Sequence, residues 1–72
     1  LQYSTIASFP PLFARELIHR YLIHHGQKEI NRANVELIFK QVNSNRGNWS
    51  IDLKEDVQIS GHNKVVTIRK KL

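Results

Sequence analysis

The stretch FPPLFARELIHRYLIHHG, residues 9–26, decides the fold of this 72-residue chain. Its apolar side chains recur at helical spacing, with Phe13, Leu17 and Tyr21 on one stripe and Ile18 and Leu22 beside it. The two prolines suit the start of a helix, where a missing N–H is no loss, and the glycine suits its end. Because an amphipathic helix needs partners for its apolar face, we expect a second helix and a sheet.

The second helix is predicted after a short connection. Asn31 is a suitable N-cap, and Ile30 and Val35 have the spacing of a hydrophobic staple. Apolar residues continue at helical spacing as far as Val42. The run NSNRGN, residues 43–48, has the composition of a turn and should end the helix.

From Trp49 onward the apolar period changes from helical to two. Residues 49–53 (WSIDL) alternate in this way, and shorter alternating runs begin at Val57 and Val65. Polar turns separate them, one at KED and one at Gly61, His62 and Asn63. The pattern predicts an α+β fold, in which two packed helices are followed by a small antiparallel β-meander or hairpin.

We interpret residues 1–72 as one small domain, with a linker at 1–8, a helical pair at 9–43 and an antiparallel sheet at 49–70. The chain begins at Leu1 and contains no methionine, so we expect it to be a piece of a longer protein.

Composition limits the possible functions. There is no cysteine, which excludes a disulfide framework and a thiolate metal site, and no apolar run reaches the length of a membrane span. The formal charge is +5, from 11 Lys and Arg against 6 Asp and Glu. This surplus favours an acidic partner, nucleic acid first and anionic membrane second.

Neither a catalytic nor a metal site is predicted. The carboxylates are scattered, whereas a general acid and base would have to converge in one cleft. A helical zinc-binding histidine pair is spaced by four, but His24 and His25 are five and six residues from His19, and His62 is remote.

Basic side chains gather on the polar side of the first predicted helix and on the connection after it. Extended cations contact phosphates without sequence preference. We therefore predict RNA contacts by Arg15, His19, Arg20, Lys28 and Arg32, with Arg46, Lys70 and Lys71 as second choices.

The aromatic residues are less suited to stacking on bases. Phe13, Tyr21, Phe39 and Trp49 all fall on apolar stripes, so we expect them in the core. Recognition of RNA would then depend on its backbone and shape.

Three runs, PPLFARELIHRYLIHHG, INRANVELIFKQV and WSIDL…VQISGHNKVVTI, resemble the segment after the catalytic domain of bacterial and plastid tRNA(Ile)-lysidine synthetases. In that family a proline-led helix with basic and leucine positions is followed by a second helix, a short strand and a β-hairpin. The chain departs from the family pattern at Lys54-Glu55, where a Pro-Gly turn is usual, and at Ile59 and Gly61, where Arg and Tyr are usual.

The resemblance implies a parent enzyme that uses ATP to adenylate the wobble cytidine of an isoleucine tRNA and then attaches lysine. The ATP loop of that family, Ser-Gly-Gly-x-Asp-Ser, is absent from this chain, which should therefore hold no cofactor and catalyse nothing alone. The implied partners are tRNA and the parent's catalytic domain, with no membrane or metal. The implied location is the cytoplasm or the plastid stroma.

Two alternatives stay open. The first is a winged-helix DNA-binding module. Two features count against it: only two clear helices precede the hairpin, and the second helix has few base-reading side chains on its outer face. A third helix within residues 1–8 would favour it. The other is a protein-interaction domain that docks on the parent's catalytic domain. An exposed patch holding Tyr3, Phe9 or Trp49 would favour that function.

Overall fold

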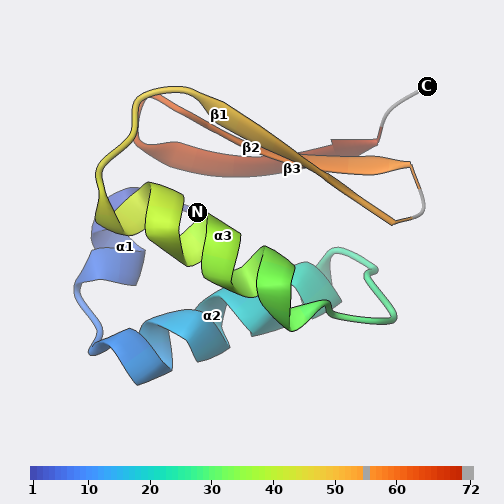
Figure 1. Ribbon diagram of the computed structural model, residues 1–72, viewed down its shortest axis with the longest axis horizontal. Coiled ribbons are helices and arrows are strands. Elements are labelled where there is room, and N and C mark those ends of the chain that lie inside the picture. The colour runs from blue at the N-terminus through green and yellow to red at the C-terminus, as the bar shows by residue number, and fades with distance from the viewer. Residues whose placement is uncertain (55, 71–72) are drawn as a thin grey trace.

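The structure is a computed structural model that describes residues 1–54 and 56–70. The helices form one layer and an antiparallel sheet forms the other (Figure 1). The chain order is α1 (Tyr3–Ala7), α2 (Pro11–His24), α3 (Arg32–Asn43), β1 (Trp49–Leu53), β2 (Val57–His62) and β3 (Val65–Lys70). The α+β class predicted from the sequence, helices followed by a three-stranded antiparallel meander, is confirmed.

The first helix lies in the segment that we interpreted as a linker, residues 1–8. Tyr3 and Ile6 are one helical turn apart and are both buried, so α1 packs its one apolar face into the core. Just before it, Leu1 pairs with the edge strand β3. The Leu1 amino group donates to the Val66 carbonyl at 3.0 Å, and the Val66 N–H donates to the Leu1 carbonyl at 2.6 Å.

The buried stripe of α2 is displaced by one position from the predicted one. Ala14, Ile18 and Leu22 are buried, whereas the Phe13 side chain is 60% exposed. The prediction that Phe13 belongs to the core is therefore wrong. Successive residues on an α-helix are about 100° apart, so a stripe centred on Ala14 and Ile18 turns Phe13 toward water.

Both long helices end in the same hydrogen-bonding pattern. After α2, the Gln27 and Gly26 N–H groups donate to the Leu22 and Ile23 carbonyls at 3.1 and 3.0 Å, and the φ of Gly26 is 91°. After α3, a left-handed Asn45 with a φ of 57° takes the corresponding place. These are Schellman motifs, which satisfy the last free carbonyls of a helix.

The start of α3 follows the sequence prediction. The Asn31 side chain accepts a hydrogen bond from the Ala33 N–H at 2.8 Å, as an N-cap does. Val35, Ile38 and Val42 are buried along one face of the helix. That face and the buried stripe of α2 form a single apolar cluster with Ile59 and Val66 of the sheet.

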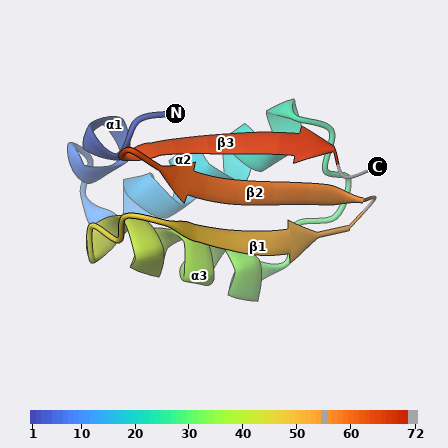
Figure 2. The ribbon, with the colours of Figure 1, turned by 90° about the horizontal axis from the view of Figure 1, so that it is seen from above.

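The strands lie in the order β1-β2-β3, and the helices cover one face of the sheet (Figure 2). Val57, Ile59 and Gly61 alternate inward along β2. The turn between β2 and β3 consists of Asn63 and Lys64, whose φ angles are 52° and 61°. Positive φ at both positions marks a type I′ turn. The predicted turn at Gly61, His62 and Asn63 is therefore right for Asn63 and wrong for Gly61 and His62, because these two residues pair with β3.

A close approach over Gly61 fixes α1 to the sheet. A Cβ atom at Gly61 would meet the Trp49 indole ring and the Tyr3 hydroxyl. The indole N–H of Trp49 donates to that hydroxyl, which donates to the Arg46 carbonyl at 2.8 Å. One tyrosine thus joins α1, β1 and the connection after α3.

Candidate nucleic-acid interface

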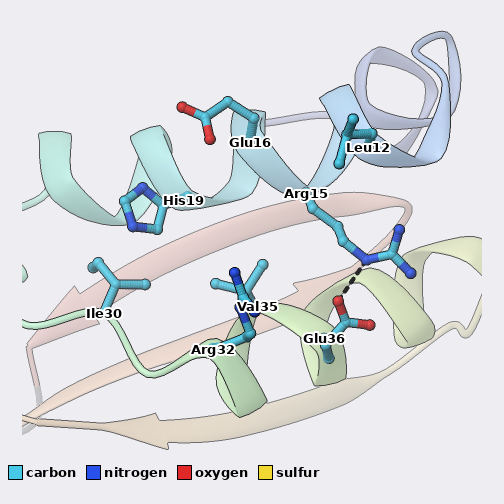
Figure 3. A pocket seen from close by; sticks show the side chains of 8 residues that line it. All are labelled: Leu12, Arg15, Glu16, His19, Ile30, Arg32, Val35 and Glu36. Atoms are coloured by element: carbon cyan, nitrogen blue, oxygen red, sulfur yellow. Dashed lines mark hydrogen bonds and ion pairs between the residues drawn. The ribbon is translucent and has the colours of Figure 1, made fainter.

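A groove of about 550 Å³ runs between α2 and α3. Figure 3 shows it from close by, with the side chains of α2 on one side and those of α3 and the preceding loop on the other. Its apolar lining is formed by Leu12, Ile30 and Val35. Its polar lining consists of Arg15, Glu16, His19, Arg32 and Glu36.

Arg15 bridges the two walls of the groove. Its Nε lies 2.5 Å from Oε1 of Glu36 (Figure 3). Its guanidinium carbon lies 4.4 Å from the centre of the Phe39 ring. The ring face attracts the cation, and the carboxylate fixes its orientation. Within the described residues the two terminal nitrogens have no acceptor, so Arg15 can still donate to a ligand.

Arg32 is the less constrained cation of the groove. It is the first residue of α3, is exposed, and forms no ion pair within the described residues. His19 is half-buried on the α2 side. The structure therefore brings together three of the predicted RNA contacts, Arg15, His19 and Arg32.

The groove leads to what we call the loop end, formed by the α2–α3 connection (residues 25–31), the β1–β2 turn and the last residue of β3, Lys70. Both views place these segments at one end of the molecule (Figures 1 and 2). The buried Gln27 side chain donates to the Lys54 carbonyl at 3.1 Å and fixes the connection to the turn. Lys28 lies in that connection, and Val57 pairs with Lys70.

An exposed ion pair also lies at the loop end. Lys54 Nζ is 2.8 Å from Oε2 of Glu29. The hydrogen bond from Lys54, and then its charge, lower the pKa of the Glu29 carboxyl, and the same pair raises the pKa of Lys54. The pair leaves Lys28 as a cation with no ion-pair partner among the described residues.

The other predicted contacts lie elsewhere. Arg20 is on α2 outside the groove lining and is paired with Glu16 at 3.0 Å. Arg46 is at the end opposite the loop end, where its Nη1 donates to Oε1 of Gln41 at 3.2 Å. Lys71 is outside the residues that the structure describes. The predicted set is thus divided among four regions, namely the groove, the loop end, the part of α2 outside the groove and the opposite end, and one of its members cannot be placed.

The sequence interpretation missed an exposed apolar cluster at the start of α2. Phe9, Leu12 and Phe13 are 45%, 75% and 60% exposed, and Leu12 also lines the groove. The run FPPLF could have indicated this cluster, because it places more apolar residues at the start of a helix than one buried face can hold. Tyr3 is buried and Trp49 half-buried, so of the three aromatic residues considered for an interaction patch only Phe9 is on the surface.

Residues 1–54 and 56–70 contain no group of three or more His, Cys, Asp or Glu side chains placed to hold a metal ion. The His24 and His25 rings meet edge to face with centroids 5.4 Å apart, and His25 lies against Tyr21 at 4.5 Å. No helix in this part of the chain is both long and apolar enough to cross a membrane.

Comparison of the chain with protein-family models, curated proteins and solved structures found no match.

Proposed function

We propose that this domain binds the phosphate backbone of a folded RNA, and that this RNA is the tRNA substrate of a lysidine synthetase-like enzyme. The observation that supports the proposal most directly is the placement of cations along one path. Arg15, His19 and Arg32 line the α2–α3 groove, and Lys28 and Lys70 lie at the loop end to which it leads. A folded RNA presents phosphates along such a path.

The charge balance along the path supports an anionic ligand. Glu16, Glu29 and Glu36 are each already bound to a cation, so their charges are offset within the domain. Lys28 and Arg32 have no such partner among the described residues. Among the described residues that line the groove, the unpaired charge is therefore positive, in line with the +5 of the whole chain.

The aromatic residues support backbone contact over base stacking. Arg15 covers the Phe39 ring, Trp49 bonds to Tyr3, and Tyr21 is half-buried with its hydroxyl donating to the Val66 carbonyl at 3.3 Å. These rings are held by contacts within the domain, and the exposed rings of Phe9 and Phe13 belong to the apolar cluster at the start of α2.

We favour this function over a winged-helix DNA-binding module. Helix α1 supplies the third helix that such a module requires, which is a point in its favour. The exposed face of α3, however, carries Ala33, Glu36, Leu37 and Lys40. An acidic and an apolar side chain at its centre are poorly suited to the major groove.

The test is binding of an isoleucine tRNA transcript to the 72-residue chain across a range of salt concentrations. Arg15 and Arg20 are poor sites for substitution because each holds a glutamate. The double variant Lys28→Ala/Arg32→Ala should bind several-fold more weakly and lower the salt slope by roughly one for each lost contact.

The matched control is Arg69→Ala. Arg69 is exposed on the outer face of the sheet, opposite Gln58, and its loss removes a charge away from the groove. It should leave both affinity and slope close to those of the unmodified chain. Equal weakening by Arg69→Ala, or equal affinity for duplex DNA of similar length, would contradict the proposal.

A second function is favoured by the exposed cluster of Phe9, Leu12 and Phe13. Apolar side chains gathered on a small domain mark a surface that another protein can cover. We propose that this cluster contacts the catalytic domain of the parent enzyme, which the RNA-binding function also requires. Replacing Phe13 with Ser should then weaken association with that domain added as a separate chain, and unchanged association would exclude this role.

A further inference from the structure

A second hollow, of about 560 Å³, lies at the end of the molecule opposite the loop end. It is formed between α1, the end of α3 and the β2–β3 turn, and Figures 1 and 2 show these three segments at the same end of the molecule. Amide side chains make up most of its polar lining. The residues are Gln2, Ser4, Asn43, Asn45, Asn63 and Lys64.

The walls of this hollow are held together by one residue, Tyr3. Its N–H donates to the Lys64 carbonyl at 2.9 Å, which fixes the β2–β3 turn against the start of α1. Its hydroxyl donates to the Arg46 carbonyl at 2.8 Å, which fixes the segment after α3. Because Tyr3 is buried, all three walls are anchored to the core and the hollow is formed before any ligand arrives.

Of the polar side chains around the hollow, Ser4 donates from Oγ to Oε1 of Gln2 at 3.4 Å, whereas the asparagines are unused by the described part of the protein. Within the described residues, the side chains of Asn43, Asn45 and Asn63 have no hydrogen-bond partner. Asn45, Asn63 and Lys64 have φ angles of 57°, 52° and 61°, so two turns present these side chains around the same space.

We propose that this hollow binds a nucleotide, with the base edge against the asparagine amides and the phosphate against Lys64. A side-chain amide presents an NH₂ donor group beside a carbonyl acceptor, the combination that matches N7 and N6 of adenine. Adenine is therefore the preferred base. The lysine ammonium supplies the charge that a phosphate requires.

Other ligand classes fit less well. Among the described residues no carboxylate lines the hollow, which disfavours a metal ion or a basic peptide. Tyr3 is the one aromatic residue that the described part of the chain contributes to the lining, and it is buried, so it offers no exposed ring on which a sugar could pack. A neutral base joined to an anionic phosphate accounts for both the amides and the lysine.

The experiment is a titration of the 72-residue chain followed by nuclear magnetic resonance, in which asparagine side-chain NH₂ signals are resolved from the backbone. AMP, up to about 10 mM to cover a millimolar Kd, should shift the signals of Asn43, Asn45 and Asn63 in a saturable way. Ribose 5-phosphate, which lacks the base, should leave them in place, and UMP should bind more weakly than AMP.

The variant Asn63→Gly removes one amide and retains the turn, because glycine adopts positive φ without strain. It should weaken AMP binding about tenfold, the effect of losing one well-placed base contact. Arg69→Ala, on the outer face of the sheet, is the matched control and should bind AMP as before. Absence of saturable shifts, equal shifts with ribose 5-phosphate, UMP binding as tight as AMP, or unchanged binding by Asn63→Gly would overturn the proposal. Since no RNA is present, this site and the RNA-binding groove can each fail without the other.

Discussion

Gly61 is the residue at which the fold leaves no room for a side chain. It faces inward on β2, where the Trp49 indole and the Tyr3 hydroxyl cover its Cα. Those groups cannot move away without breaking hydrogen bonds, because Trp49 donates to Tyr3 and Tyr3 donates to the Arg46 carbonyl. A methyl group here would have to break the chain of hydrogen bonds or separate α1 from the sheet.

We therefore expect Gly61→Ala to lower the free energy of unfolding by about 2 kcal/mol, within the range of overpacked cores. Urea denaturation followed by Trp49 fluorescence measures the change. Gly47→Ala is the control, because no atom lies within 4 Å of a Cβ built there, and its effect should stay within about 0.5 kcal/mol. Similar losses in the two variants would show that the contact over Gly61 carries no special cost.

At the scale of single residues, sequence patterns often predicted whether a side chain is buried or exposed. They did not predict the Gly61 contact. Gly61 was interpreted as a turn residue, since glycine before His and Asn is typical of a turn. The tyrosine that covers Gly61 lies near the other end of the sequence. A local sequence pattern contains no information on contacts between residues so far apart along the chain.

At the scale of elements, the two long helices were predictable because their ends carry their own chemistry. The N-cap at Asn31 and the glycine after α2 both have the predicted roles. Helix α1 was not predictable, since its five residues are too few to show a helical period. It is stabilised by burial of Tyr3 and Ile6, which depends on the sheet being present.

The cap of α3 gives a prediction at this scale. Asn31→Ala removes the acceptor of the Ala33 N–H and should cost about 1 kcal/mol in the free energy of unfolding. Asn31→Asp keeps a capping oxygen and should retain most of the stability. Asn43→Ala, at the last residue of α3, is the matched control because its side chain forms no hydrogen bond in the described part of the chain. If Asn31→Ala and Asn43→Ala unfold at the same urea concentration, the cap contributes nothing.

At the scale of the whole molecule, the sequence placed the cations on the surface but did not show which of them share a groove. Arg15 and Arg20 belong to the same predicted polar side of α2. In the structure Arg15 turns to Glu36 on α3, whereas Arg20 turns to Glu16 on its own helix. Which residue reaches the groove depends on how the two helices pack, and helical period alone does not fix that geometry.

The two layers should unfold together, because neither has a core of its own. Ile18 and Leu22 of α2 and Ile38 of α3 belong to the same buried cluster as Ile59 and Val66 of the sheet. A domain of this size buries roughly 60% of its unfolded surface, so separation of the layers would remove most of the apolar burial of each. A partly folded state is therefore unstable relative to both the folded and unfolded states.

The single tryptophan makes this cooperativity measurable. Trp49 reports on β1 and its contact with α1, and far-ultraviolet circular dichroism at helical wavelengths reports mainly on α2 and α3. Both signals should give the same urea midpoint, and Gly61→Ala should lower the two midpoints by the same amount. A fluorescence transition that precedes the loss of helix, in the unmodified chain or in Gly61→Ala, would mean that the sheet layer opens by itself. In that case the hollow that depends on Tyr3 would open with the sheet while the α2–α3 groove persisted, and the proposed nucleotide binding would be lost at a lower urea concentration than the proposed RNA binding.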